Sequence, residues 1–170
     1  MPIPQNRLFQ LVQQQLEAHF GRKILMNKVG NGIAAVRITP SERVLLKIKY
    51  SREHLPDNLH QHLDRVAWFT FSEADFSNSA PPFLTLVQGA EENNLMYLTL
   101  PKQTLRQLIA SNGTDFKMHI DYAKPGHVFA SRGPSMEARL ACAESRQFLT
   151  ERHPERDLTE WLGKWQQLAS

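Results

Sequence analysis

Residues 23–50 read KILMNKVGNGIAAVRITPSERVLLKIKY and contain three short runs of aliphatic and β-branched residues. The runs span 23–26, 33–38 and 44–50, and they are separated by Gly-Asn-Gly at 30–32 and Thr-Pro-Ser-Glu at 39–42. Both separators are strong turn signals. The pattern predicts three consecutive strands in an antiparallel meander.

Helical and strand patterns continue on both sides of this meander. Before it, residues 7–20 place Leu8, Leu11, Val12, Leu16 and Phe20 at intervals of three and four, and Gly21 follows, which predicts an amphipathic helix. After it, the sequence predicts a helix over 59–71, a surface loop over 72–82, strands over 83–87 and 95–100, a helix from Pro101 to 112–113, and a strand over 116–122. Residues 68–71 are equally compatible with a strand.

Two helices are predicted at the C-terminal end of the chain. The first covers about 135–152; the second opens at Asp157, with Glu160 three residues on as in a capping box. It presents the apolar stripe Leu158, Trp161, Leu162, Trp165 and Leu168. We therefore predict a single α+β domain over 1–170, in which a core over 5–110 has a central mixed or antiparallel sheet flanked by helices and 114–170 forms a C-terminal loop and helical extension.

The composition fits one ordinary globular domain. The chain has 170 residues, of which 41% are hydrophobic and 22% charged. No apolar run approaches the ~20 residues that cross a bilayer, so we expect no membrane association. The start of the chain lacks the pattern of a secretory signal, and the single cysteine, Cys142, excludes an intrachain disulfide and a cysteine-based zinc site. These features predict a cytoplasmic protein.

Charge is distributed unevenly along the chain. Residues 1–53 hold 9 Lys and Arg against 3 Asp and Glu, residues 54–121 hold 4 against 8, and residues 122–170 hold 7 against 6, which sums to the net +3. A basic first third favours a polyanionic partner, DNA or RNA. The candidate nucleic-acid-binding residues are Lys47, Lys49, Arg37, Arg43, Lys28 and Arg52. The alternative is that they are ordinary solvated charges at strand ends.

The predicted order of helix, three strands, helix, two strands and helix over about 5–110, with the phrase LTLPKQTL at 98–105, resembles the PD-(D/E)XK restriction-endonuclease-like superfamily. The resemblance implies an Asp on the second strand and Glu-x-Lys on the third, which together hold a divalent metal and activate water. Here Ala34 or Ala35 stands for the Asp and Lys47 for the Glu, while Lys49 matches the family lysine. The resemblance therefore implies a nuclease-like domain without catalytic residues, metal or cofactor.

Other candidate sites are weaker. Glu17, Glu42 and Asp64 are acids that a relocated metal site could use, although nothing in their spacing brings them together. His54, His60 and His62 lack metal-ligand spacing, and Cys142 suits packing. Arg132, Arg139 and Arg146 recur every seven residues, and 127–133 is a candidate binding loop.

Three functions remain open. The first is a non-catalytic, nuclease-like domain that binds nucleic acid, or a nucleic-acid-processing complex, with Lys47 and Lys49 at the centre of the contact. The second is a small protein-interaction module, such as an inhibitor or accessory subunit of a bacterial or phage system. The third is a metal-dependent nuclease with relocated acids.

Overall fold

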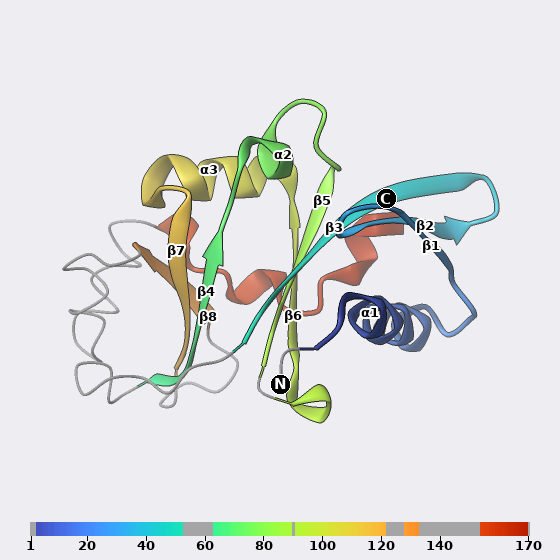
Figure 1. The fold of residues 1–170 in the computed structure, drawn as a ribbon, viewed down its shortest axis with the longest axis horizontal. Helices are drawn as coiled ribbons and strands as arrows, with labels where there is room; N and C mark the ends of the chain where they lie inside the picture. Colours follow the sequence, from blue (N-terminus) through green and yellow to red (C-terminus); the bar gives the residue numbers. More distant parts are fainter. Residues whose placement is uncertain (1–2, 53–62, 90, 122–127, 133–153, 170) are drawn as a thin grey trace.

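The computed structural model describes residues 3–52, 63–89, 91–121, 128–132 and 154–169. In these parts the chain is an α+β protein in which a five-stranded mixed sheet lies beside a three-stranded sheet (Figure 1). The elements in chain order are α1 (Gln5–Phe20), β1 (Leu25–Gly30), β2 (Ile33–Thr39), β3 (Glu42–Ser51), β4 (Leu63–Thr70), α2 (Glu73–Phe76), β5 (Phe83–Gln88), η2 (Glu92–Asn94), β6 (Met96–Pro101), α3 (Lys102–Asn112), β7 (Asp115–Asp121), β8 (Val128–Arg132), η3 (Pro154–Arg156), η4 (Thr159–Trp161) and η5 (Trp165–Ala169).

The larger sheet has the strand order β1-β2-β3-β5-β6. The predicted meander is confirmed, since β1, β2 and β3 pair antiparallel through the two turns. β3 then pairs with β5 in parallel, and β5 pairs with β6 antiparallel. The smaller sheet, β4-β7-β8, is antiparallel throughout.

Helix α1 covers one face of the larger sheet. Its buried residues Leu8, Val12 and Leu16 pack against the cluster that contains Val36 and Leu46, as the three-and-four spacing predicts. The left-handed Gly21 (φ 68°) ends the helix, and its N–H donates to the carbonyl of Glu17. The same face holds a buried hydrogen bond, 3.0 Å long, between the hydroxyls of Thr85 and Thr99.

The opposite face of β5 and β6 is the second half of the core. Leu84 and Leu100 on the sheet pack with Leu105 and Leu108 of α3 and with Phe69 of β4. Because side chains alternate along a strand, β5 and β6 supply both clusters. In Figure 1, α2 and α3 lie toward the top of the view, and β4, β7 and β8 lie beside the larger sheet.

The helix predicted over 59–71 is wrong for the described residues, because Leu63–Thr70 is the strand β4. Its backbone pairs along its length with β7, where Trp68 lies opposite Lys117 and Thr70 opposite Asp115. Pairing with a partner strand overrides a helical spacing of apolar residues. The alternative prediction of a strand over 68–71 correctly assigned the last residues of β4 to a strand. The strand predicted over 116–122 is confirmed as β7, whereas 128–132, predicted as part of a binding loop, is β8.

The predicted helix from Asp157 is also wrong. The structure has the short 3₁₀ turns η3, η4 and η5, interrupted by Gly163 at φ 59°. At this break the N–H of Gly163 donates to the carbonyl of Tyr97, and Leu162 forms a bridge with Leu98. Pairing with β6 therefore replaces a continuous helix. The apolar stripe still packs inward: Trp165 is buried, with its ring centroid 5.9 Å from that of Tyr97. The helix predicted over 135–152 lies outside the described residues.

An exposed ion pair joins α1 to the β5–β6 connection. Arg7 donates two hydrogen bonds, of 2.9 and 2.8 Å, to the carboxylate of Glu92. The hydrogen bonding with Arg7 lowers the pKa of Glu92, while burial raises the pKa of the nearby Tyr97 phenol. Across the described ranges, we find no helix that is both long enough and apolar enough to span a membrane.

Candidate functional site

The two faces of β3 differ in character. Leu46 and Ile48 belong to the core under α1, so Lys47 and Lys49 lie on the opposite face. On that face their neighbours on β5 belong to the core under α3. The lysine side chains are only 16% and 24% exposed. They therefore lie where this part of the core meets the surface and are not freely solvated.

Lys49 is held from three sides. Its Nζ donates to Oδ2 of Asp75 at 2.7 Å and to the carbonyl of Thr70 at 2.6 Å. The same atom lies 4.9 Å from the centroid of the Phe71 ring, within the range of a cation–π interaction. These contacts connect the end of β4 and the helix α2 to the central strand β3.

Lys47 connects the same helix to the β1–β2 turn. Its Nζ donates to the carbonyl of Asn31 at 2.8 Å and lies 3.9 Å from Oδ1 of Asp75. Gly32, in that turn, has φ +69° and lies close to both Lys47 and the carbonyl of Ile48, which an added Cβ would approach to 3.1 Å. Glycine therefore suits both the left-handed backbone of this turn and the close approach of Lys47.

Asp75 is the residue that sequence reasoning missed. It lies on α2 with a side chain only 3% exposed, and Oδ2 accepts a 2.9 Å hydrogen bond from the N–H of Ser72. The surface loop predicted over 72–82 overlooks this helix, although Ser72-x-x-Asp75 has the spacing of a helix N-terminus. Two ammonium groups face one carboxylate here, so the cluster Lys47–Lys49–Asp75 keeps one net positive charge.

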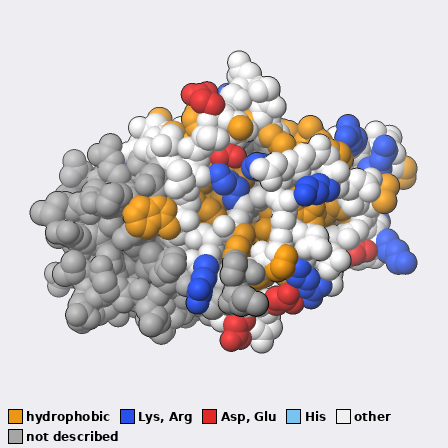
Figure 2. All heavy atoms as spheres, viewed as in Figure 1, with side chains coloured by type: hydrophobic (Ala, Val, Ile, Leu, Met, Phe, Trp, Pro, Cys, Tyr) orange, Lys and Arg blue, Asp and Glu red, His pale blue; other side chains and the backbone are white. Residues whose placement is uncertain are grey.

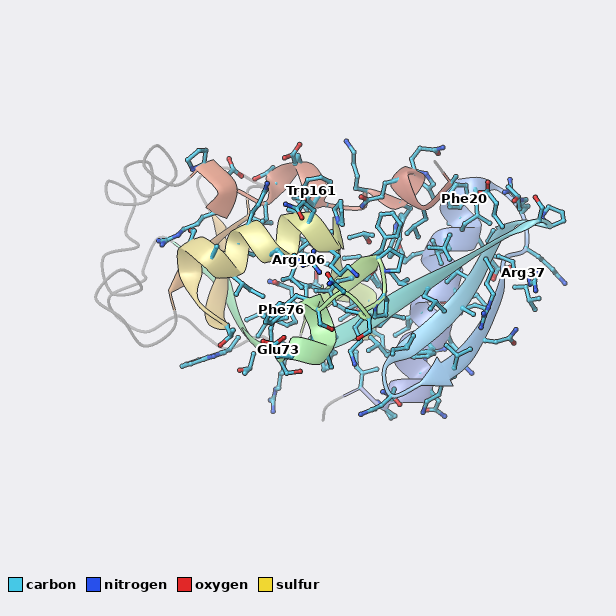
Figure 3. The ribbon with its side chains drawn as sticks, turned by 90° about the horizontal axis from the view of Figure 1, so that it is seen from above. Phe20, Arg37, Glu73, Phe76, Arg106 and Trp161 are labelled. Atoms are coloured by element: carbon cyan, nitrogen blue, oxygen red, sulfur yellow. The ribbon has the colours of Figure 1, made fainter. Side chains whose placement is uncertain are left out.

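Helix α3 fixes the position of α2. Arg106 donates to the carbonyl of Phe76 at 2.7 Å and to Oδ1 of Asn78 at 3.0 Å. Lys102 donates to the carbonyls of Asn78 and Ala80 at 3.1 and 2.9 Å. Figure 3 shows Arg106 close to Phe76. The carboxylate of Asp75 is therefore presented to the two lysines by a short helix that is itself well anchored.

Arg37 and Arg43 extend the basic face of β3 toward the β2–β3 turn. They are cross-strand partners, and both are exposed. Their register places them on the same face as Lys47 and Lys49. Arg37 donates to the carbonyl of Pro40 at 3.3 Å. In Figure 2, several Lys and Arg side chains lie on the side of the molecule formed by β1–β3.

The other two candidate residues lie apart from this face. Lys28 pairs in register with Ala34, whose side chain packs under α1, and its Nζ donates to Oε1 of Gln5 on that helix at 2.7 Å. Arg52 follows the end of β3 and is exposed. The structure thus brings Arg37, Arg43, Lys47 and Lys49 to one face and leaves Lys28 and Arg52 outside it.

The positions at which the nuclease resemblance would expect acids hold alanine and lysine. Ala34 is buried against α1, and Ala35, on the lysine face, pairs with Leu45. Glu17 accepts a 3.4 Å hydrogen bond from the N–H of Ile24 on the α1 side, and Glu42 is exposed at the start of β3. In the part of the chain that the structure describes, no three His, Cys, Asp or Glu side chains form a group able to hold a metal ion.

Several weaker candidates fall outside the described residues. These are the side chains of Asp64 and Arg132 and the whole of His54, His60, His62, Arg139, Cys142 and Arg146. No family model, curated protein or solved structure matches this chain. Its candidate functions therefore follow from the geometry of its own residues.

Proposed function

We propose that this chain is a non-catalytic, nuclease-like domain that binds nucleic acid or a nucleic-acid-processing complex through the basic face of β2 and β3. The exposed pair Arg37–Arg43 carries this proposal, because the two residues are cross-strand partners on the face that also holds Lys47. No Asp or Glu occurs between Glu17 and Glu42. Such a surface attracts polyanions.

The expected contact is with phosphate and not with base edges. Arginine guanidinium groups match phosphate oxygens in a bidentate geometry, and exposed arginines on a strand can reach a backbone without entering a groove. Lys47 and Lys49 contribute the remaining positive charge from a partly buried position, and Asp75 neutralises half of that charge. We therefore expect binding without sequence preference.

The absence of cleavage in this proposal follows from the residue types at the face. Metal-dependent hydrolysis needs carboxylates that together hold a divalent ion. Among the described side chains, Asp75 is the acid that contacts Lys47 and Lys49, and its charge is already offset by theirs. A site with a net positive charge repels a divalent cation and favours an anion.

The test is a titration of purified protein against labelled single- and double-stranded DNA and RNA at several salt concentrations, with Mg²⁺ and Mn²⁺ cleavage controls. The double variant Arg37→Gln/Arg43→Gln should weaken binding and reduce the magnitude of the duplex salt slope by about 2. Lys28→Gln, on the other face, is the matched control and should leave both unchanged. Equal affinity of the double variant and the wild type would refute the site, and metal-dependent cleavage would support the third function.

A second candidate function is a protein-interaction module, such as an inhibitor or accessory subunit of a bacterial or phage system. The observation that favours it is the outer edge of the larger sheet. β1 is the last strand on that side, and its Leu25 and Val29 are exposed.

A further inference from the structure

Among the described residues, the two outer edges of the larger sheet differ in whether another segment pairs with them. At the β6 edge the C-terminal segment supplies backbone partners: Gly163 donates to the carbonyl of Tyr97 at 2.9 Å, and Leu162 forms a bridge with Leu98. Gln167 also donates to the carbonyl of Thr99 at 2.6 Å. This edge is covered.

The β1 edge has no such cover among the described residues. β1 pairs with β2 on one side, and within the described ranges no backbone group bonds its outer side. Leu25 is 55% exposed and Val29 is 47% exposed, and the remaining large exposed apolar side chain of the described residues, Trp68, lies on β4. Open edges with exposed apolar side chains are templates for another strand.

The charged side chains around β1 indicate which kind of strand could bind at this edge. Arg22 and Lys23 precede it, Lys28 lies within it, and Arg37 is the cross-strand partner of Leu25. Arg22 is held in place by a hydrogen bond to the carbonyl of Ile38 and by the ring of Phe20. All four side chains are exposed and basic.

We infer that the outer edge of β1 is a docking site for an extended segment of another protein in which apolar and acidic residues alternate, and which adds to the sheet as a sixth strand. A peptide supplies both donors and acceptors for the unpaired backbone of β1, which a phosphate backbone does not. A second copy of β1 would place its basic residues beside those of the first copy, and like charges on neighbouring strands are destabilising. The register shift between Lys28 and Gly30 limits the straight part of the edge to Leu25–Lys28, so the docked strand is short.

The probe is a peptide with capped termini in which valine and glutamate alternate. Two control peptides are compared with it. One alternates valine and lysine, and the other has the composition of the probe but with its valines in one run and its glutamates in another. Only the alternating acidic peptide should bind, and the amide NMR signals of Leu25–Lys28 should shift. The variant Leu25→Thr/Val29→Thr, which leaves the charge unchanged and has β-branched residues suited to a strand at both positions, should weaken binding about tenfold. Trp68→Thr, the matched loss of an exposed apolar side chain elsewhere, should not.

Each contrary result has a definite meaning. Equal binding of all three peptides, unchanged affinity of Leu25→Thr/Val29→Thr, or shifts confined to other strands would overturn the inference. Concentration-dependent dimerisation that Leu25→Thr/Val29→Thr abolishes would replace the acidic segment with a second copy and overturn it as well. Failure of the nucleic-acid proposal is seen separately, in the salt titration of Arg37→Gln/Arg43→Gln.

Discussion

Asp75→Asn tests the cluster at the junction of β3 and α2. The substitution is nearly isosteric and keeps an oxygen that accepts the hydrogen bond from Ser72. It removes the negative charge that faces Lys49 at 2.7 Å and Lys47 at 3.9 Å. The variant therefore isolates the charge interaction from the shape of the site.

The expected loss of stability lies between two limits. Removing one partner of a fully buried ion pair costs about 3–5 kcal/mol, and exposed pairs contribute about 0–1 kcal/mol. Asp75 is 3% exposed and Lys49 is 24% exposed, and Lys49 keeps its hydrogen bond to Thr70. We therefore expect the free energy of unfolding to fall by about 2–3 kcal/mol.

Urea unfolding followed by tryptophan fluorescence and circular dichroism measures this loss. With an m-value of about 2 kcal/mol per molar urea, the midpoint should fall by about 1–1.5 M. Glu73→Gln is the control, since it makes the same charge change at an exposed position of the same helix. Unfolding of Asp75→Asn at the wild-type midpoint would show that the Asp75 charge does not stabilise the fold. Under the proposed function, the same variant should bind DNA more tightly, because both lysines lose their internal anion.

Three further substitutions test other parts of the structure. Gly32→Ala should destabilise the protein by about 1–2 kcal/mol in urea unfolding, because alanine disfavours φ +69° and its Cβ would lie 3.1 Å from the Ile48 carbonyl oxygen. Gln88→Met should raise the unfolding midpoint by an amount equivalent to about 1 kcal/mol, because neither amide atom of this buried side chain has a hydrogen-bond partner in the described structure. Glu92→Gln should lower the thermal midpoint at pH 7. The difference between the thermal midpoints of variant and wild type should shrink as the pH falls through the lowered pKa of Glu92, because protonated Glu92 no longer forms an ion pair with Arg7. A difference in midpoint that persists at acid pH would contradict this.

The local elements were predictable where the pattern agreed with the final packing. The spacing of Leu8, Val12 and Leu16 identified α1, and the glycine and proline turns delimited the meander. The errors at β4 and after Asp157 have a common cause. In each case a segment with helical spacing gains backbone partners from a strand distant in sequence, β7 for one and β6 for the other. Sequence spacing carries no information about such partners.

The candidate site was predictable only in part. Alternation along β3 correctly placed Lys47 and Lys49 together on one face, and the turn between β2 and β3 brought Arg37 beside Arg43. The sequence did not reveal that Asp75 would reach the lysines, because that contact depends on how α3 holds α2 against the sheet. Lys28 was misgrouped for a simpler reason: it lies on the α1 face of β1.

The parallel pairing of β3 with β5 has a consequence for folding kinetics. The meander and the β5–β6 hairpin can each form from neighbouring residues, but joining them closes the chain segment 52–82. We expect that closure to limit the folding rate. Trp165 packs in the core cluster that joins Val36 and Leu46 of the meander to Tyr97 of β6, and this cluster is complete only after the closure. Substitutions in the C-terminal segment should therefore accelerate unfolding and leave the folding rate almost unchanged.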